Sequence, residues 1–348
     1  MTMLTILLVA GIAAVLVFDF TNGFHDASNM LGTLIASRAM TPAQAVTVVG
    51  VFTFIGPVLG GTAVADTVGG FVELGGLGRA HALIIVASGV AGAIGWNLLT
   101  WRLALPSSSS HALVGGLVGA VLVSVGPQDV HWGFAALRHG HVAGVAKILL
   151  SLLISPIAGL IVGFGLHRLA KFMLRSARPQ VERTLRHAQW LTASALAFSH
   201  GTNDGQKGMG IIALLLVLTG VQAHLDVPLW AIALSALAMT CGTLVGGWRI
   251  VRTVGYGIYR LRPLHGLDVQ LTSSAVILAA SAFGGPVSTT HVVSTAIMGV
   301  GASERPRGVH WGKARQILAT WVLTLPGAAL AGAAFCGLAL PWIAQLPQ

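Results

Sequence analysis

Two pairs of polar sequences lie inside otherwise apolar stretches of the chain. The first pair is Phe20–Asp26 and Phe198–Asp204, which share Phe, Gly and Asp in register. The second pair is Pro106–His111 and Pro286–His291, in which a proline is followed by hydroxyl residues and a histidine, and it recurs at nearly the same offset along the chain. Chance can supply one such match in an apolar chain. Two matches in the same order, with matching gaps, indicate an internal duplication.

Asp26 and Asp204 place a carboxylate at the same point of each copy. A charge at membrane depth costs at least about 2.5–3.5 kcal/mol, so each carboxylate needs a bound cation, a proton or a neighbouring base. Flanking asparagine oxygens suit Na⁺, and a carboxylate also takes a proton. The alternative is a structural ion pair of Asp204 with Lys207. The expected cation-coupling residues are Asn22, His25, Asp26, Asn29, Asn203 and Asp204, with the two aspartates as the candidate sodium ligands.

The hydroxyl clusters follow a proline and precede an apolar run, which is the pattern of a helix start. Free backbone N–H groups and the helix dipole favour an anion there, and the hydroxyls can donate to a tetrahedral oxyanion. One such cluster alone is explained by a plain N-cap, whereas two in opposed halves favour a shared anion pocket. The expected anion-binding residues are Ser108, Ser109, Ser110, Ser288, Thr289, Thr290, Gln206 and Lys207.

Several residues beside these clusters have simpler interpretations. Three roles are open for His111 and His291, which could carry a proton, donate to an anion or serve as hydrogen-bonded structural histidines. Glycines that follow the clusters, such as Gly119 and Gly299, are expected to allow close helix contact. The two cysteines lie in apolar segments and match no metal spacing or disulfide framework, so no resident cofactor is expected.

The composition places the motifs in a membrane. Hydrophobic residues make up 55% of the 348 and charged residues 9%, with a mean hydropathy of +0.82, whereas a soluble domain carries about 25% charged residues. Polar residues interrupt the first, overlong segment of each set, so broken helices are expected there. Apolar segments are expected at 4–37, 43–65, 81–104, 108–126 and 143–167, and again at 189–220, 227–248, 270–284, 290–302 and 313–342.

Five crossings separate the two sets, and an odd number reverses the second set in the membrane. Basic residues test this count because cytoplasmic loops are rich in Lys and Arg. With 168–186 inside, 16 Lys and Arg face the cytoplasm, 3 lie on the outer side and Lys207 lies within the membrane. The net charge of +10 is therefore mostly an orientation signal, and no nucleic acid partner is expected.

The sequence thus predicts an all-α integral membrane protein with two inverted-topology repeats of about five spans each. The repeats cover 1–167 and 189–348 and are joined by a basic cytoplasmic connector at 168–188. Broken or re-entrant helices are expected at the motifs, and both termini are expected outside. This architecture is typical of secondary transporters that bind substrate near the midplane and alternate access to it.

The four motifs together resemble the inorganic phosphate transporter (PiT) family, most closely its bacterial low-affinity branch. Gly23, Asp26 and Asn29 match the family pattern Gly-x-Asn-Asp-x-x-Asn, with His25 where Asn is usual. The second copy matches up to Asp204 and then departs. The resemblance covers essentially the whole chain.

The resemblance implies uptake of inorganic phosphate coupled to H⁺ or Na⁺ across the bacterial inner membrane. It implies phosphate contacts from the Ser/Thr motifs and cation contacts from the Asn/Asp motifs. His25 and Lys207 depart from the family pattern and leave the coupling ion open. A divalent metal carried with phosphate and a homodimer also stay open, while membrane lipid is an expected neighbour.

Other functions fit the residues less well. A sulfate or other tetrahedral oxyanion permease of the same fold is the nearest alternative. A membrane-embedded hydrolase needs one asymmetric nucleophile, base and orienting group, whereas the groups here are duplicated. A primary pump needs a Walker loop or a soluble phosphorylated domain, which the sequence lacks. A channel would carry the anion without dependence on a cation gradient.

Overall fold

A computed structural model of the chain describes residues 2–343. The regular structure of these residues is helical, apart from an isolated bridge between Val72 and Val130. The first half comprises α1 (Met3–Ala36), α2 (Pro42–Leu59), α3 (Ala63–Gly69), α4 (Arg79–Arg102), α5 (Ser109–Ser124), η1 (Pro127–Asp129), α6 (Phe134–Arg138) and α7 (Gly144–Met173). The second half comprises α8 (Val181–Leu218), α9 (Leu229–Val245), α10 (Trp248–Gly257), α11 (Pro263–Ala282), α12 (Thr289–Glu304), η2 (Pro306–Gly308) and α13 (Trp311–Ile343).

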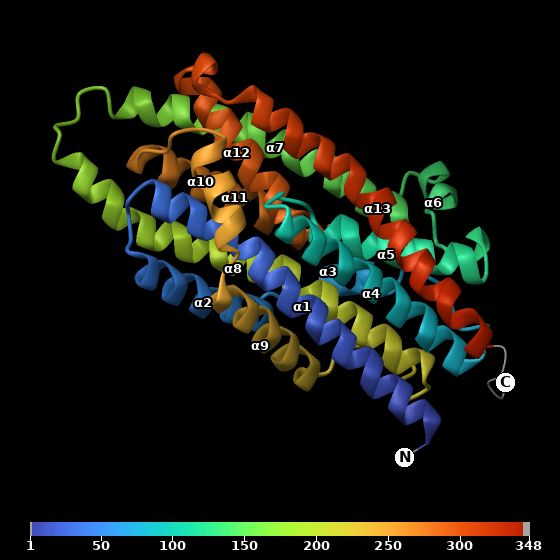
Figure 1. Ribbon diagram of the computed structural model, residues 1–348. Helices are drawn as coiled ribbons and strands as arrows, with labels where there is room; N and C mark the ends of the chain where they lie inside the picture. Colours follow the sequence, from blue (N-terminus) through green and yellow to red (C-terminus); the bar gives the residue numbers. More distant parts are fainter. Residues whose placement is uncertain (1, 344–348) are drawn as a thin grey trace.

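The helices form an elongated bundle (Figure 1). The start of α1 and the end of α13 lie at one end of it, and the connection between α7 and α8 lies at the other. Within residues 2–343, five helices are long and apolar enough to cross a membrane, namely α1, α2, α4, α7 and α13. A sixth span is counted if α9 and α10, which meet at an angle of 70°, form one broken crossing.

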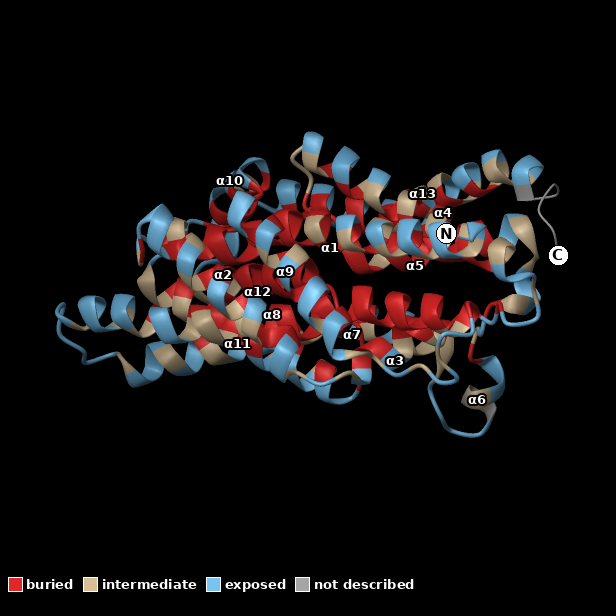
Figure 2. Ribbon diagram, turned by 90° about the horizontal axis from the view of Figure 1, so that it is seen from below, coloured by how far each residue is buried: buried red, intermediate tan, exposed pale blue. Residues whose placement is uncertain are grey.

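The outer surface of the bundle is apolar and its interior holds the polar residues. Leu153 on α7 is 63% exposed and Leu330 on α13 is 73% exposed. In contrast, Asp26, Asp204 and Lys207 are all at most 2% exposed, and buried residues fill the centre of the bundle (Figure 2). A soluble protein has the opposite distribution, with its polar residues outside and its apolar residues inside.

The order of elements repeats along the chain, and helices of one half pack against helices of the other. Each half contains, in order, a long helix, two shorter ones, a fourth helix, a 16-residue helix, a 3-10 turn and a second long helix. Helix α6 is an insertion in the first half. Helix α1 packs on α9, and its counterpart α8 packs on α2. Likewise α5 packs on α13, and α12 packs on α7.

Glycines permit these close approaches, as the sequence predicted. A Cβ atom on Gly119 of α5 would overlap the backbone of Ala329 on α13. A Cβ atom on Gly299 of α12 would overlap the carbonyl of Leu160 on α7. The equivalent helix pairs of the two halves therefore share one packing device.

The expected breaks at the Asn/Asp motifs are wrong. Helices α1 and α8 run without interruption through 22–29 and 200–207. A helix satisfies its own backbone in the bilayer, and the polar side chains of these motifs find partners on other helices, so nothing forces a break. The interruptions lie instead at 103–108 and 283–288, directly before α5 and α12.

Three other boundaries differ from expectation. The segment expected at 43–65 is divided at Gly60, where α2 ends, and α3 follows as a separate short helix. Helix α11 begins at Pro263, before the expected 270, because a proline at the first position starts a helix well. Much of the polar connector is helical, since α7 continues to Met173 and α8 begins at Val181.

Candidate ion and anion site

The two hydroxyl clusters are helix starts, as predicted. The Ser108 hydroxyl accepts a hydrogen bond from the backbone N–H of His111 at 3.2 Å and so caps α5. The Ser288 hydroxyl accepts from the N–H of His291 at 3.3 Å and caps α12. Both ends present the positive pole of the helix dipole to the same region.

The starts of α5 and α12 meet in the interior. The Ser110 hydroxyl donates to the backbone carbonyl of Val287 at 2.9 Å. Ser109, Ser110, Thr289 and Thr290 are all buried. Two helix N-termini from different halves therefore converge, which gives the donor groups for an anion.

Asp26 is bonded directly to the start of α12. The Thr290 hydroxyl donates to Asp26 Oδ1 at 2.9 Å and accepts a hydrogen bond from Asn29 Nδ2 at 2.9 Å. His25 Nδ1 lies 3.1 Å from the same carboxylate oxygen. The hydroxyl of Thr290, a predicted anion-binding residue, therefore bonds directly to two predicted cation-coupling residues, Asp26 and Asn29.

Asp204 forms the internal ion pair that the sequence left open. Lys207 Nζ donates to Asp204 Oδ1 at 2.5 Å and also to the carbonyl of Val287 at 3.0 Å. The same ammonium donates to the Ser110 hydroxyl. His200 Nδ1 lies 3.3 Å from Asp204 Oδ2 and 3.1 Å from the Thr289 hydroxyl. The ammonium therefore lies between the two helix starts and not only beside its carboxylate.

Equivalent residues make equivalent contacts across the two halves. Asn29 and Lys207 each come three positions after the aspartate of their motif, and Ser110 and Thr290 each come directly before the histidine of theirs. Asn29 donates to Thr290, and Lys207 donates to Ser110. Each carboxylate helix thus reaches the helix start of the opposite half, and neither half builds its side of the site alone.

The two carboxylates share one cluster that can hold a cation. Asp26, His200 and Asp204 offer ligand atoms that all lie within 4.8 Å of one another. Asp26 and Asp204 supply two carboxylates and Lys207 supplies one ammonium, so one carboxylate has no ammonium paired with it. In low dielectric such a charge is costly, so a monovalent cation or a proton suits this cluster.

Several buried polar atoms of the site have no hydrogen-bond partner among residues 2–343. They include the Ser109 hydroxyl, both amide atoms of Asn22, Asn29 Oδ1 and His200 Nε2. An unsatisfied buried polar atom costs about 1–3 kcal/mol. All of these residues except His200 were predicted to bind ions, so a ligand can satisfy their unpaired atoms.

The structure separates two predicted residues from the convergent set. Gln206 Oε1 accepts a hydrogen bond from the backbone N–H of Val64 at 2.7 Å, so its side chain faces the start of α3. Asn203 Oδ1 accepts from the N–H of Val287 at 3.0 Å, which supports the loop before α12. Asn203 therefore contacts the segment that precedes the hydroxyl residues of α12, and Gln206 bonds to a different element.

Asp19 is a buried carboxylate that the sequence reasoning missed. It is 0% exposed, and neither oxygen has a hydrogen-bond partner among the described residues. A Cβ on Gly208 of α8 would overlap both oxygens, so the carboxylate lies directly on that backbone. Its spacing of seven residues from Asp26, two helical turns, was the available signal.

Comparison with known proteins identifies the family. The model of the phosphate transporter family (PHO4) matches residues 22–332. The chain belongs to this family. A probable low-affinity inorganic phosphate transporter of Bacillus subtilis (strain 168) is 39% identical over 336 residues, covering 96% of this chain and 97% of that one. The protein of the same description from Rhizobium meliloti (strain 1021) is 39% identical over 329 residues, covering 94% and 95%.

A solved structure shares the fold of this phosphate transporter family member. The sodium-dependent phosphate transporter superposes with a TM-score of 0.84 at 25% identity, covering 97% of this chain and 99% of that chain. The resemblance inferred from the four motifs is therefore confirmed. The chain is a multi-pass membrane transporter and not an enzyme, which removes the hydrolase alternative.

Proposed function

We propose that this protein takes up inorganic phosphate by symport with a cation, either H⁺ or Na⁺. Its relatives from Bacillus subtilis and Rhizobium meliloti are described as probable low-affinity inorganic phosphate transporters, and the similar solved structure is described as sodium-dependent. Residue chemistry supports the same assignment, because the converging helix starts offer donors to a tetrahedral anion beside a cluster of carboxylates.

The contact that carries this proposal is the hydrogen bond from Thr290 to Asp26. While Asp26 is charged, the Thr290 hydroxyl donates to it at 2.9 Å. A cation or proton on Asp26 weakens that bond and frees the hydroxyl to donate to phosphate. Phosphate then binds well only after the cation, which makes the coupling electrostatic and ordered.

Charge balance supports symport over free passage of the anion. A phosphate that enters a site with an uncompensated negative charge meets repulsion in low dielectric. A cation bound between Asp26 and Asp204 removes that repulsion. Lys207 supplies further positive charge, because its ammonium lies within reach of the Ser110 hydroxyl at the start of α5.

Alternating access by two inverted repeats is part of the proposal. The exchanged contacts, Asn29 with Thr290 and Lys207 with Ser110, are what two repeats related by a twofold axis in the membrane plane would make. We further propose the bacterial inner membrane as the location, with the connector inside and both termini outside. Co-transport of a divalent metal and homodimer formation remain sequence predictions.

Uptake of labelled phosphate into proteoliposomes tests the proposal. Imposed Na⁺ and H⁺ gradients, applied separately, should show that at least one of them drives accumulation above equilibrium. Asp26→Ala and Asp204→Ala should each abolish coupled uptake. Sulfate accumulation without phosphate accumulation would establish the oxyanion alternative, and gradient-independent phosphate flux would establish a channel. Normal coupled uptake by both variants would remove the cation assignment.

A further inference from the structure

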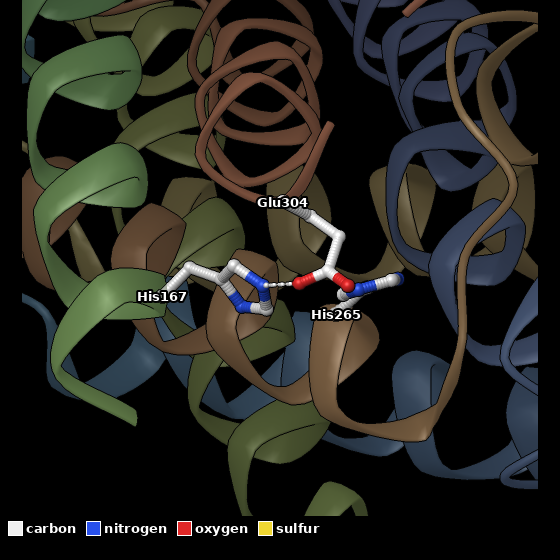
Figure 3. Close-up of side chains that lie close together, drawn as sticks. All are labelled: His167, His265 and Glu304. Atoms are coloured by element: carbon white, nitrogen blue, oxygen red, sulfur yellow. Dashed lines mark hydrogen bonds and ion pairs between the residues drawn. The ribbon is translucent and has the colours of Figure 1, made fainter. Parts of the chain in front are cut away.

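A second cluster of metal-binding side chains lies far from the transport site. His167 near the end of α7, His265 at the start of α11 and Glu304 at the end of α12 offer ligand atoms that all lie within 4.8 Å of one another. Figure 3 shows the Glu304 carboxylate between the two imidazole rings. Fourteen residues separate Thr290 from Glu304, which is roughly 20 Å along α12. The two sites are therefore distinct.

His167 is oriented in the way that metal-binding histidines are. Its Nδ1 lies 2.7 Å from Asp268 Oδ2, and its Nε2 lies 3.1 Å from Glu304 Oε2. His167 and Asp268 are both buried. A carboxylate on one ring nitrogen fixes the ring and leaves the other nitrogen aimed at the metal position. Asp268 therefore has the role of an outer carboxylate, and Glu304 the role of a ligand.

The charges at Glu304 match those of a divalent ion. Lys171 Nζ lies 2.7 Å from the same oxygen that faces His167. The His167 ring and the Lys171 ammonium both face this one carboxylate oxygen, and a divalent ion would supply positive charge at the same point. The Lys171 side chain is 48% exposed and free to turn into solvent.

The distances need small adjustments to enclose an ion. Ligands of a tetrahedral zinc ion lie about 2.0–2.2 Å from it and hence roughly 3.3–3.5 Å from one another. The 3.1 Å between His167 Nε2 and Glu304 Oε2 is close to this separation. His265 has the larger change to make, because its Nδ1 accepts a hydrogen bond from the Arg262 N–H at 3.1 Å. Binding through its Nε2 moves the ring proton to Nδ1 and breaks that cap.

We propose that His167, His265 and Glu304 form a binding site for a late first-row divalent cation, with Zn²⁺ as the best fit. Two imidazoles and one carboxylate suit zinc, and the fourth position remains for water. The bound ion would join α7, α11 and α12 at one point. Helix α12 carries Thr289 and Thr290 at its other end, so the ion would restrain a helix that transport has to use.

Metal binding to the purified full-length protein tests the site without any transport measurement. Zn²⁺ titration by calorimetry and Co²⁺ titration by visible absorption should show one site in the wild type. His167→Gln and Glu304→Gln should lose it, and Asp268→Asn should weaken it by about tenfold. Because Lys171 competes with the ion for Glu304, Lys171→Gln should bind Zn²⁺ more tightly than the wild type.

Two controls separate this site from other histidines and carboxylates. His187→Gln removes an exposed histidine on α8 and should leave binding unchanged. Asp26→Asn with Asp204→Asn removes the carboxylates of the transport site and should also leave it unchanged. The proposal would be overturned if neither the wild type nor Lys171→Gln bound Zn²⁺. It would also be overturned if binding were lost only in the variant with Asp26→Asn and Asp204→Asn. Both results are independent of whether the protein carries phosphate.

Discussion

At the scale of residues, the site depends on a few hydroxyl and carboxylate contacts whose partners are distant in sequence. Thr290 reaches Asp26 over 264 residues and Lys207 reaches Ser110 over 97. The first contact joins a predicted anion-binding residue to a predicted cation-coupling residue, and the second is linked to the cation side because Lys207 also pairs with Asp204. Occupancy by one ion therefore changes the hydrogen bonds available to the other.

Thr290→Val tests whether the hydroxyl that contacts Asp26 also contributes to phosphate binding. Valine keeps the shape of threonine and removes the hydroxyl that donates to Asp26. One lost hydrogen bond to a charged partner corresponds to about 1.5–3 kcal/mol, so the KM for phosphate should rise by at least about tenfold. Initial rates of labelled phosphate uptake at several cation concentrations measure this change.

Thr295→Val is the matched control for Thr290→Val. Thr295 lies one to two turns further along α12, and its hydroxyl donates only to carbonyls of its own helix, those of His291 and Val292. Its substitution should leave the KM near that of the wild type. An equal rise in both variants would show that α12 is disturbed in general and that the Thr290 hydroxyl has no special part.

Asp204→Asn should destabilise the protein, whereas Asp19→Asn should not. Asp19 has no hydrogen-bond partner among the described residues, so a neutral amide of the same shape should leave the melting temperature unchanged or raise it. Asp204→Asn leaves the buried Lys207 ammonium without its carboxylate, which costs about 3–5 kcal/mol. Thermal unfolding in detergent compares the two. If Asp19→Asn lowered the melting temperature as much as Asp204→Asn, Asp19 would have to be paired in the folded protein, which would contradict the prediction.

At the scale of elements, glycines set how closely the helices approach. Gly119→Ala adds a Cβ that would overlap the backbone of Ala329, so α5 and α13 must move apart. Overpacking of this kind costs about 1–3 kcal/mol and should lower the melting temperature. Gly165→Ala on α7 is the control, because nothing lies within 4 Å of the added Cβ. That variant should gain up to about 1 kcal/mol from helix propensity, and equal losses in both would refute the packing argument.

The helix starts were predictable from sequence because their cause is local. Proline and hydroxyl residues before an apolar run favour an N-cap wherever the run packs, and Ser108 and Ser288 are N-caps in the structure. The expected breaks in α1 and α8 failed because their outcome depends on distant partners. The polar side chains of α1 and α8 can be buried without a break because Thr290 and Ser110, which lie elsewhere in the chain, form hydrogen bonds with them.

The cluster at His167 escaped prediction for the same reason. His167, His265 and Glu304 lie on three helices and follow no fixed spacing. Gln206 shows the converse, since it is adjacent to Lys207 and yet bonds to the start of α3. Adjacent residues on a helix point in different directions, and sequence proximity alone did not separate them.

At the scale of the whole molecule, the basic residues and the packing make one prediction about orientation. The connector between α7 and α8 lies at the opposite end of the bundle from α6 (Figure 1). In a chain with Cys241 and Cys336 replaced by serine, His139→Cys should react with an impermeant maleimide on intact cells. Arg178→Cys should react only after the membrane is opened. Reaction of both from the same side would contradict the proposed topology.

The exchange of contacts between the halves also has a consequence for biosynthesis. Asp26 enters the membrane with α1, but its partner Thr290 is made 264 residues later. At about 5–20 residues per second, synthesis leaves the carboxylate without that partner for roughly 13–50 s. During this interval Asp26 and Asn29 lack the Thr290 hydroxyl that both contact in the complete chain, and the carboxylate has only His25 beside it. A chain that stops before α12 should therefore be retained by insertion factors or degraded, whereas the completed chain closes both sides of the site.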